Sequence, residues 1–233
     1  MNQNDFINEL NNLNIYPSEL QLKQLDRYYE LLIQYNKVMN LTGITEKEDV
    51  YLKHFYDSLT IVKVINLDNE YSLCDIGTGA GFPGVVLKIL FPKLKVTLVD
   101  SLNKRINFLN IVIDELNLTG IVAIHDRIEE YGKKHRELFD IATARAVASL
   151  NVLLEFSIPL VKINGYFIPL KGKLEQEPSY QNALNELHCI IEKKIFFQLP
   201  KENSSRNLLL IKKCKRTEKK YPRDNAKIKK QPL

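Results

Sequence analysis

The sequence predicts an α/β fold in which a mostly parallel sheet carries helices on both faces and follows an N-terminal helical extension. Three observations support this class. From residue 71 onward, short apolar segments alternate with segments of helical periodicity. The first 60 residues show only helical patterns, and a glycine-rich loop follows the first apolar segment. The 233 residues are enough for one sizeable domain with an extension.

Two long helices are expected in the N-terminal extension, residues 1–66. Ser18 is the predicted N-cap of the first helix, because it follows Pro17 and precedes a periodic apolar run. The apolar face of this helix is predicted to comprise Leu20, Leu22, Leu25, Tyr28, Tyr29, Leu32 and Val38. The second helix is expected over 46–65. Neither helix interior contains Gly or Pro, the residues that are least favourable there.

The core, residues 67–216, is expected to alternate strands and helices. The predicted strands are 71–76, 95–100, 121–126, 139–144 and 164–170. The helices between them are predicted at 82–91, 103–117 and 149–162. Two β-rich segments, 189–200 and 205–215, are expected to close the sheet as an antiparallel pair. Residues 217–233 then form a basic C-terminal tail of a single structural domain.

The composition argues against several function classes. Charges interrupt every apolar run well before 18 residues, and residues 1–10 lack the regions of a signal peptide. The three cysteines, Cys74, Cys189 and Cys214, have no CxxC or histidine spacing, so neither a disulfide framework nor a zinc site is expected. We therefore expect a cytoplasmic protein that neither contacts a membrane nor holds a metal.

The net charge of +5 is unevenly distributed along the chain. Residues 212–233 hold ten basic and two acidic residues, whereas the first 211 hold 23 basic and 26 acidic residues. Such a tail is typical of polyanion binding, although a solvated, frayed terminus explains it as well. The candidate phosphate contacts are Lys212, Lys213, Lys215, Arg216, Lys219, Lys220 and Arg223.

The segment LCDIGTGAGFPG, residues 73–84, joins the first strand to the next helix. Gly77, Gly79 and Gly81 let the backbone turn sharply and approach a ligand without a Cβ in the way. Pro83 suits the first position of a helix, and the free N–H groups of a helix start form an electropositive cradle. In a doubly wound sheet, this crevice lies at the carboxyl ends of the strands.

Three ligand classes compete for this loop. The nicotinamide or flavin pattern GxGxxG fits residues 79–84 but lies two residues late, and a Walker loop would need a Lys-Ser/Thr pair that is absent. An S-adenosylmethionine (SAM) loop of pattern acid-x-G-x-G-x-G matches from Asp75 to Gly81. A carboxylate such as Asp75 opposes a pyrophosphate but suits the amino group of methionine. Asp100, 23 residues after Gly77, ends the second strand and is placed to accept ribose hydroxyls or to start the next helix. The SAM interpretation is favoured.

Five segments, taken together, resemble one protein family. They are NLTGI (40–44), HFYDSL (54–59), DIGTGAGFPG (75–84), ARAVASL (144–150) and YPR (221–223). From about residue 35 to the C-terminus, the chain resembles the bacterial 16S ribosomal RNA guanine-N7 methyltransferases, also called glucose-inhibited division protein B. The resemblance implies a class I SAM-dependent methyltransferase with a Rossmann-like, mostly parallel seven-stranded sheet. It also implies one guanine of the 530 loop as the target, in 16S rRNA or in the small ribosomal subunit; we expect a monomer.

The resemblance assigns roles to residues at matching positions. Gly77 and Phe82 belong to its SAM loop, Ile128 and Glu129 to its adenine-proximal pair, and Arg145 to its cofactor and substrate pocket. With the loop residues above, the predicted cofactor contacts are Asp75, Gly77, Gly79, Gly81, Phe82, Asp100, Ile128, Glu129 and Arg145. The predicted RNA contacts are Arg127, Arg145, Lys171, Lys212, Lys215, Arg216 and Arg223.

The implied chemistry needs no acid or base. N7 of neutral guanine carries a lone pair and no proton, so methyl transfer requires mainly alignment of the reactants, and we assign no catalytic acid or base. His54 is expected to hydrogen-bond Asp57 one helical turn on.

Removal of residues 217–233 is expected to weaken RNA binding and to spare SAM binding. The alternatives are a SAM-dependent methyltransferase of another RNA or a small molecule, an NAD-dependent oxidoreductase, and a non-enzymatic RNA-binding scaffold.

Overall fold

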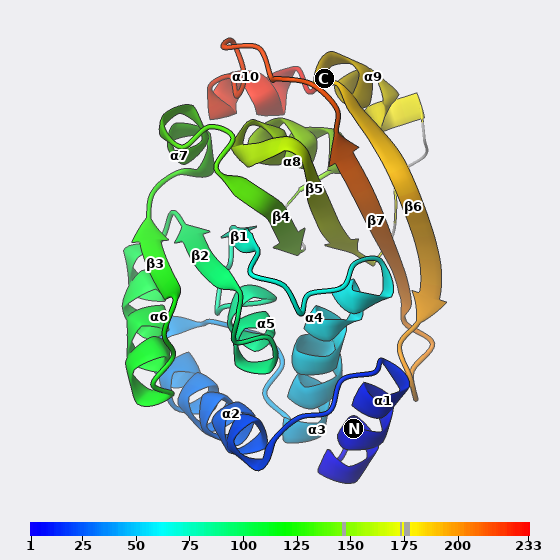
Figure 1. Ribbon diagram of the computed structural model, residues 1–233. Coiled ribbons are helices and arrows are strands. Elements are labelled where there is room, and N and C mark those ends of the chain that lie inside the picture. The colour runs from blue at the N-terminus through cyan, green and yellow to red at the C-terminus, as the bar shows by residue number, and fades with distance from the viewer. Residues whose placement is uncertain (146–147, 173, 175–177) are drawn as a thin grey trace.

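The sheet of the computed structural model has seven strands in the order β3-β2-β1-β4-β5-β7-β6 (Figure 1). The structure describes residues 1–145, 148–172, 174 and 178–233, so two residues of the ARAVASL segment lie outside the described residues. The strands are β1 Ser72–Ile76, β2 Lys95–Asp100, β3 Ile121–His125, β4 Phe139–Arg145, β5 Val161–Lys171, β6 Cys189–Gln198 and β7 Ser205–Lys213. β1 to β5 pair in parallel, and β7 is antiparallel to both β5 and β6. The predicted sheet with its antiparallel closing pair is therefore confirmed.

Helices cover both faces of the sheet and enclose two apolar cores (Figure 1). On one face lie α1 Gln3–Asn12, α2 Glu19–Met39, α3 Lys47–Val50, α4 Asp57–Leu59, α5 Gly84–Leu90 and α6 Asn103–Glu115. On the other lie α7 Ile128–Lys134, α8 Leu150–Ser157, α9 Pro178–Glu186 and α10 Asn225–Lys230. Within the described residues, none of these helices has the length and apolar character needed to cross a membrane.

Helix α2 begins as the sequence predicts. Gln21 N donates to Ser18 Oγ at 3.3 Å, and Ser18 N donates to Gln21 Oε1 at 2.9 Å, which completes a capping box. The predicted apolar face is wrong at its ends, because Leu20 and Val38 are 65% and 78% exposed. At 100° per residue, Leu20 lies about 140° around the helix from Leu25, so the two never share a face. The buried stripe comprises Leu25, Tyr28, Leu31 and Leu32.

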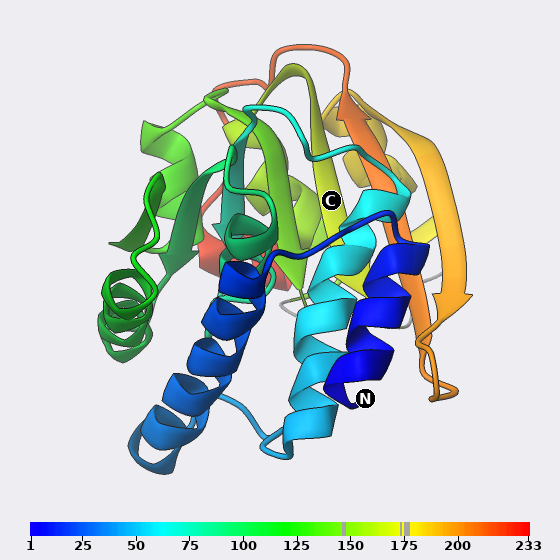
Figure 2. The same cartoon turned by 60° about the horizontal axis from the view of Figure 1, so that its bottom comes forward.

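The second predicted helix is a continuous helical run with a π-helical turn in its middle. The turn, Tyr51–Tyr56, joins α3 to α4, and a 3₁₀ turn, Thr60–Lys63, follows α4. Figure 2 shows α1 beside this run, with α2 next to it, on one face of the sheet. A π turn shifts the helical register, and such turns recur at functional sites. Here it carries a histidine into the cavity described below.

Two predicted boundaries are wrong for reasons of backbone hydrogen bonding. The helix predicted at 149–162 ends at Ser157, a 3₁₀ turn follows, and β5 starts at Val161. Pro159 lies in the 3₁₀ turn and has no N–H to continue an α-helix. Pro83 precedes the first residue of α5, Gly84, rather than opening the helix.

Candidate active site

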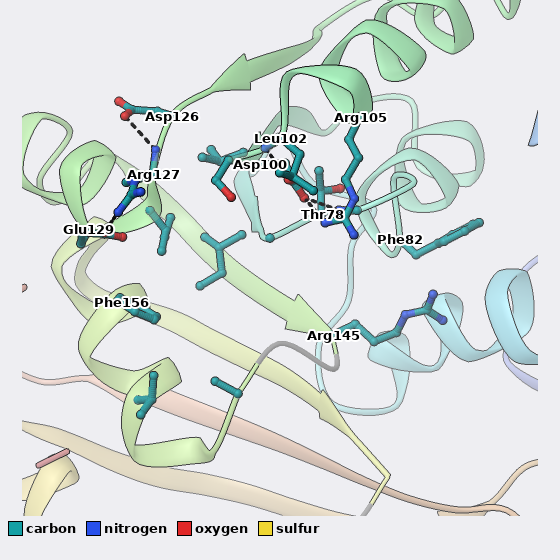
Figure 3. Close-up of a pocket in the computed structure, with 18 of the residues that line it drawn as sticks. Thr78, Phe82, Asp100, Leu102, Arg105, Asp126, Arg127, Glu129, Arg145 and Phe156 are labelled. Carbon is teal, nitrogen blue, oxygen red and sulfur yellow. Dashed lines mark hydrogen bonds and ion pairs between the residues drawn. The ribbon is translucent and has the colours of Figure 1, made fainter. Parts of the chain in front are cut away.

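A cavity of about 1040 Å³ lies at the carboxyl ends of β1 to β4 (Figure 3). The predicted site residues that line it are Gly77, Gly79, Phe82, Asp100, Arg127, Ile128, Glu129 and Arg145. Asp75, Gly81 and Lys171 do not line it. Residues that were not predicted from the sequence also line it, among them Thr42, Thr78, Leu102, Arg105, Phe156 and Lys229. Thr42 lies in the quoted NLTGI segment, which was the available signal for the contribution of the N-terminal helices.

Asp75 stabilises the glycine loop by hydrogen bonds on the side away from the cavity. Its Oδ2 accepts hydrogen bonds from Thr78 Oγ1 at 2.7 Å and from Gly84 N at 2.8 Å, which ties the loop to the start of α5. The side chain is fully buried, and this burial raises the pKa of Asp75 to about 7. Asp75 therefore shapes the loop and does not line the cavity, while its predicted contact with the ligand stays a prediction.

The glycines of the loop differ in what surrounds them. All three have positive φ, between 62° and 103°. A Cβ on Gly79 would meet only Gly77 O at 4.0 Å, whereas a Cβ on Gly81 would lie 2.6 Å from both Tyr28 Oη and Val85 Cγ2. Gly79 therefore leaves open space toward the cavity, and Gly81 allows close packing against α2.

This difference predicts unequal stability losses. We expect Gly79→Ala to lower the free energy of unfolding by about 1 kcal/mol, the cost of a positive φ with a Cβ. Gly81→Ala should cost about 3 kcal/mol, because overpacking adds to the same backbone strain. Urea titration of both variants measures the two values. Equal losses would contradict the packing described for Gly81.

Asp100 holds the start of the next helix, as one of the two predictions had it, and the glycine loop as well. Its Oδ2 accepts from Gly79 N at 2.9 Å and from Arg105 Nη1 at 3.1 Å, and its Oδ1 accepts from Leu102 N at 2.9 Å. Leu102 is the N-cap of α6, so Asp100 fixes the glycine loop and the start of that helix at once. Each carboxylate oxygen has further lone pairs for a ligand hydroxyl.

A stack of three side chains forms one end of the cavity (Figure 3 labels Phe82 and Arg145). The Phe82 ring lies 4.4 Å from the His54 ring and 4.9 Å from the Arg145 guanidinium carbon. Arg145 Nη2 donates to His54 Nδ1 at 3.0 Å, and Nη1 donates to Lys53 O at 2.8 Å. With Nδ1 as acceptor, His54 carries its proton on Nε2, which donates to Thr42 Oγ1 at 2.8 Å.

Burial, and the positive charge of Arg145, lower the pKa of His54 to about 3. The ring is therefore neutral at physiological pH and acts as a hydrogen-bonding spacer. The expected bond from His54 to Asp57 is wrong: within the part of the chain that the structure describes, the ring nitrogens of His54 contact Thr42, Lys53 O and Arg145. Arg145 itself approaches Asp57 to 3.6 Å. The π turn places the histidine toward the cavity.

The other end of the cavity is formed at the start of α7 (Figure 3). Ile128 and Glu129 are its first two helical residues, and the Glu129 carboxylate is almost fully buried. Arg127 is exposed, and its Nη1 lies 3.9 Å from Glu129 Oε1. Phe156 of α8 lines the same end. Apolar side chains and one buried acceptor thus meet where the resemblance places an adenine.

The candidate phosphate contacts fall into different environments. Arg216 is 83% exposed and Lys215 is also exposed, as a phosphate contact requires. Lys212 pairs with Glu192 at 3.3 Å, and Lys171 Nζ donates to Ala148 O at 2.9 Å. Lys213 contradicts the prediction: its side chain is fully buried.

The partners of Lys213 explain its burial. Its Nζ donates to Ile158 O at 3.0 Å and to Val161 O at 2.9 Å, and it pairs with Glu137 at 3.1 Å. These contacts join β7 to the turn that precedes β5. This lysine is therefore a structural cation and is not available to a phosphate.

Arg223 also has a different role from the predicted one. Its Nε donates to Glu155 Oε1 at 2.7 Å, and its backbone N donates to the same oxygen at 2.9 Å. The Glu155 side chain is fully buried in α8, so Arg223 neutralises it from the C-terminal tail. The same partner explains why the position carries an arginine, which can make two parallel bonds to a carboxylate.

The C-terminal tail is part of the fold. Tyr221, Pro222 and Ile228 are buried, α10 packs on α8, and Lys229 and Pro232 line the cavity. The frayed-terminus alternative is therefore wrong. The structure now favours a wider effect of removing 217–233, because the removal would take away part of the cavity wall and uncover an apolar core.

Comparisons with known proteins agree with this arrangement. Residues 21–209 match the family model described as rRNA small subunit methyltransferase G (GidB). A "Ribosomal RNA small subunit methyltransferase G" of Bacillus cytotoxicus is 49% identical over 237 residues, which cover 100% of this chain and 99% of that protein. No group of His, Cys, Asp and Glu suited to a metal occurs among the described residues.

Solved structures show the same fold at low identity. A SAM-dependent methyltransferase from Aquifex aeolicus superposes with a TM-score of 0.51 and 16% identity, over 71% of this chain and 93% of that one. TrmK of M. capricolum in complex with S-adenosyl-homocysteine superposes with a TM-score of 0.53 and 20% identity, over 73% of this chain and 72% of that one. The fold is that of class I SAM-dependent methyltransferases. The family model matches about four-fifths of the chain and the relative matches all of it, so the chain belongs to the rRNA small subunit methyltransferase G family.

Proposed function

We propose that this methyltransferase transfers a methyl group from SAM to N7 of one guanine in the 530 loop of 16S rRNA. One observation carries the proposal: a single cavity joins the glycine loop to the stack of Phe82, His54 and Arg145. A cofactor subsite thereby adjoins a flat subsite for a base. We further propose that the enzyme acts in the cytoplasm as a monomer, on 16S rRNA or the small ribosomal subunit, with residues 1–66 as an extension of the 67–216 core and 217–233 as its basic tail.

The residues of the cavity fit SAM. Gly79 leaves space for close approach, and the carboxylate of Asp100 lies beside the loop with acceptor capacity for ribose hydroxyls. Ile128 and Phe156 supply apolar surface, and the buried carboxylate of Glu129 supplies an acceptor, as an adenine ring with its amino group requires. When bound, SAM supplies a methyl group on a positively charged sulfur.

The protein's own contribution to the reaction is positioning. The Arg145 guanidinium, held over the buried Phe82 ring, offers a flat surface on which a guanine stacks, and an arginine N–H is a good donor to the O6 acceptor of guanine. Because N7 carries no proton, no side chain has to remove one. His54, neutral and hydrogen-bonded on both ring nitrogens, keeps the guanidinium in place.

Charges around the cavity support RNA over a small molecule as substrate. Arg127 and Lys229 are exposed and line the cavity, and Lys215 and Arg216 are exposed on the segment that leads to the tail. Such cations bind phosphates and release counterions, so binding should weaken steeply with salt. Recognition of one base in folded RNA also requires a splayed nucleotide, which a stacking subsite accommodates.

Methyl transfer from SAM with a tritiated methyl group tests the proposal directly. The substrates are unmodified 16S rRNA and unmodified small subunits, and nuclease mapping locates the label. We expect label in one N7-methylguanine of the 530 loop, and none when the RNA comes from cells that already carry the modification. Label at another nucleotide, or none in either substrate while calorimetry shows SAM binding, would contradict the proposed acceptor.

A further inference from the structure

A buried carboxylate lies behind the stacked end of the cavity and has no role in the reaction described above. Asp57 follows the π turn, and its side chain is buried. Its Oδ1 accepts from Arg206 Nε of β7 at 2.8 Å, and its Oδ2 lies 3.6 Å from Arg145 Nη1 at the end of β4. Neither Asp57 nor Arg206 lines the cavity. One carboxylate thus lies between two arginines from different strands.

The charges of this group do not cancel. Two guanidiniums face the Asp57 carboxylate, and the adjacent His54 is neutral. The buried Asp75 carboxyl also acts on Arg145, but its pKa of about 7 leaves it only partly ionised at neutral pH, so the group keeps a partial positive charge. Both arginines are largely buried, with side chains 15% and 19% exposed. Burial of an unmatched charge is costly, and a purely structural ion pair would need only one cation. The surplus charge suits a site that receives an electron-rich group from outside, such as a guanine carbonyl or a phosphate.

We infer that Asp57 and Arg206 are positioning residues for methyl transfer, which hold the Arg145 guanidinium against Phe82. This inference rests on the proposed function. The geometry supports it, because Arg206 fixes one oxygen of the carboxylate and so orients the other toward Arg145. Lys53 O and Asp57, both on the helical run, contact the Arg145 guanidinium, and Arg206 of β7 holds Asp57 from the sheet. Groups that align reactants need such support, because small displacements lower rates strongly.

Replacement of Arg206 tests the inference without touching a cavity-lining residue. We expect Arg206→Met to lower kcat by about 10- to 100-fold while the Kd for SAM, measured by calorimetry, changes less than about two-fold. Arg206→Lys should recover part of kcat, because it keeps the charge without the planar fork. Arg27→Met is the matched control: Arg27 makes exposed ion pairs with Glu30 and Glu115, and its loss should leave kcat unchanged.

A double-mutant cycle separates positioning from a general structural role. In an Arg145→Met background, Arg206→Met should cause no further loss of kcat, because its effect passes through Arg145. Equal fold-losses in both backgrounds, or an unchanged kcat in Arg206→Met alone, would overturn the inference. If the wild-type enzyme does not label 16S rRNA, the proposed function fails while the inference stays testable. The two substitutions should then be non-additive in the free energy of unfolding, and additivity would overturn the inference.

Discussion

Arg145→Met is expected to lower kcat for methyl transfer by about 100- to 1000-fold, the usual effect of removing one preorganised donor at a reaction centre. The guanidinium is stacked on Phe82 and hydrogen-bonded to His54, so methionine keeps the length of the side chain but removes both the charge and the donors. Because the cofactor contacts proposed here lie on the glycine loop, β2 and α7, SAM affinity should stay within about two-fold. Single-turnover methyl transfer and calorimetry measure the two quantities.

Arg145→Lys serves as the matched variant for this prediction. Lysine keeps the charge but has neither the planar stack on Phe82 nor the two-sided donor pattern, so its kcat should lie between those of wild type and Arg145→Met. A loss of SAM affinity as large as the loss of kcat would place Arg145 in the cofactor subsite alone. An unchanged kcat would exclude it from the base subsite.

Arg223→Ala is expected to lower the free energy of unfolding by about 3–5 kcal/mol, the cost of leaving one partner of a buried ion pair without compensation. The residue left behind is Glu155, which is fully buried in α8. Urea titration at neutral pH measures the loss.

Two further variants separate this effect from the loss of a surface charge. Arg216→Ala removes an arginine that is 83% exposed, and its cost should stay below about 1 kcal/mol. The double variant Arg223→Met with Glu155→Leu should recover most of the stability, because an apolar pair no longer buries a charge. Similar small losses in Arg223→Ala and Arg216→Ala would show that the tail is not anchored through Glu155.

Local patterns in the sequence predicted much of the fold and part of the site. Alternation of apolar segments gave the strands and the helices between them, because each element's periodicity is set by its own backbone geometry. Ser18 was identifiable as a helix N-cap from its neighbours alone. The three glycines were likewise identifiable as a ligand loop from the local pattern. Asp100 was placed correctly because parallel strands bring their carboxyl ends to one edge of the sheet.

The partners of charged side chains were decided only by the tertiary structure. Arg145 meets His54 across 91 positions of the chain, and Arg223 meets Glu155 across 68. The sequence by itself determined the elements, the ligand loop and the family resemblance, since these depend on residues close together in the chain. Which lysine or arginine is buried, and which stays exposed, depends on strand register and on how the tail packs on α8. No short segment encodes that choice, because burial is a property of the surfaces that meet.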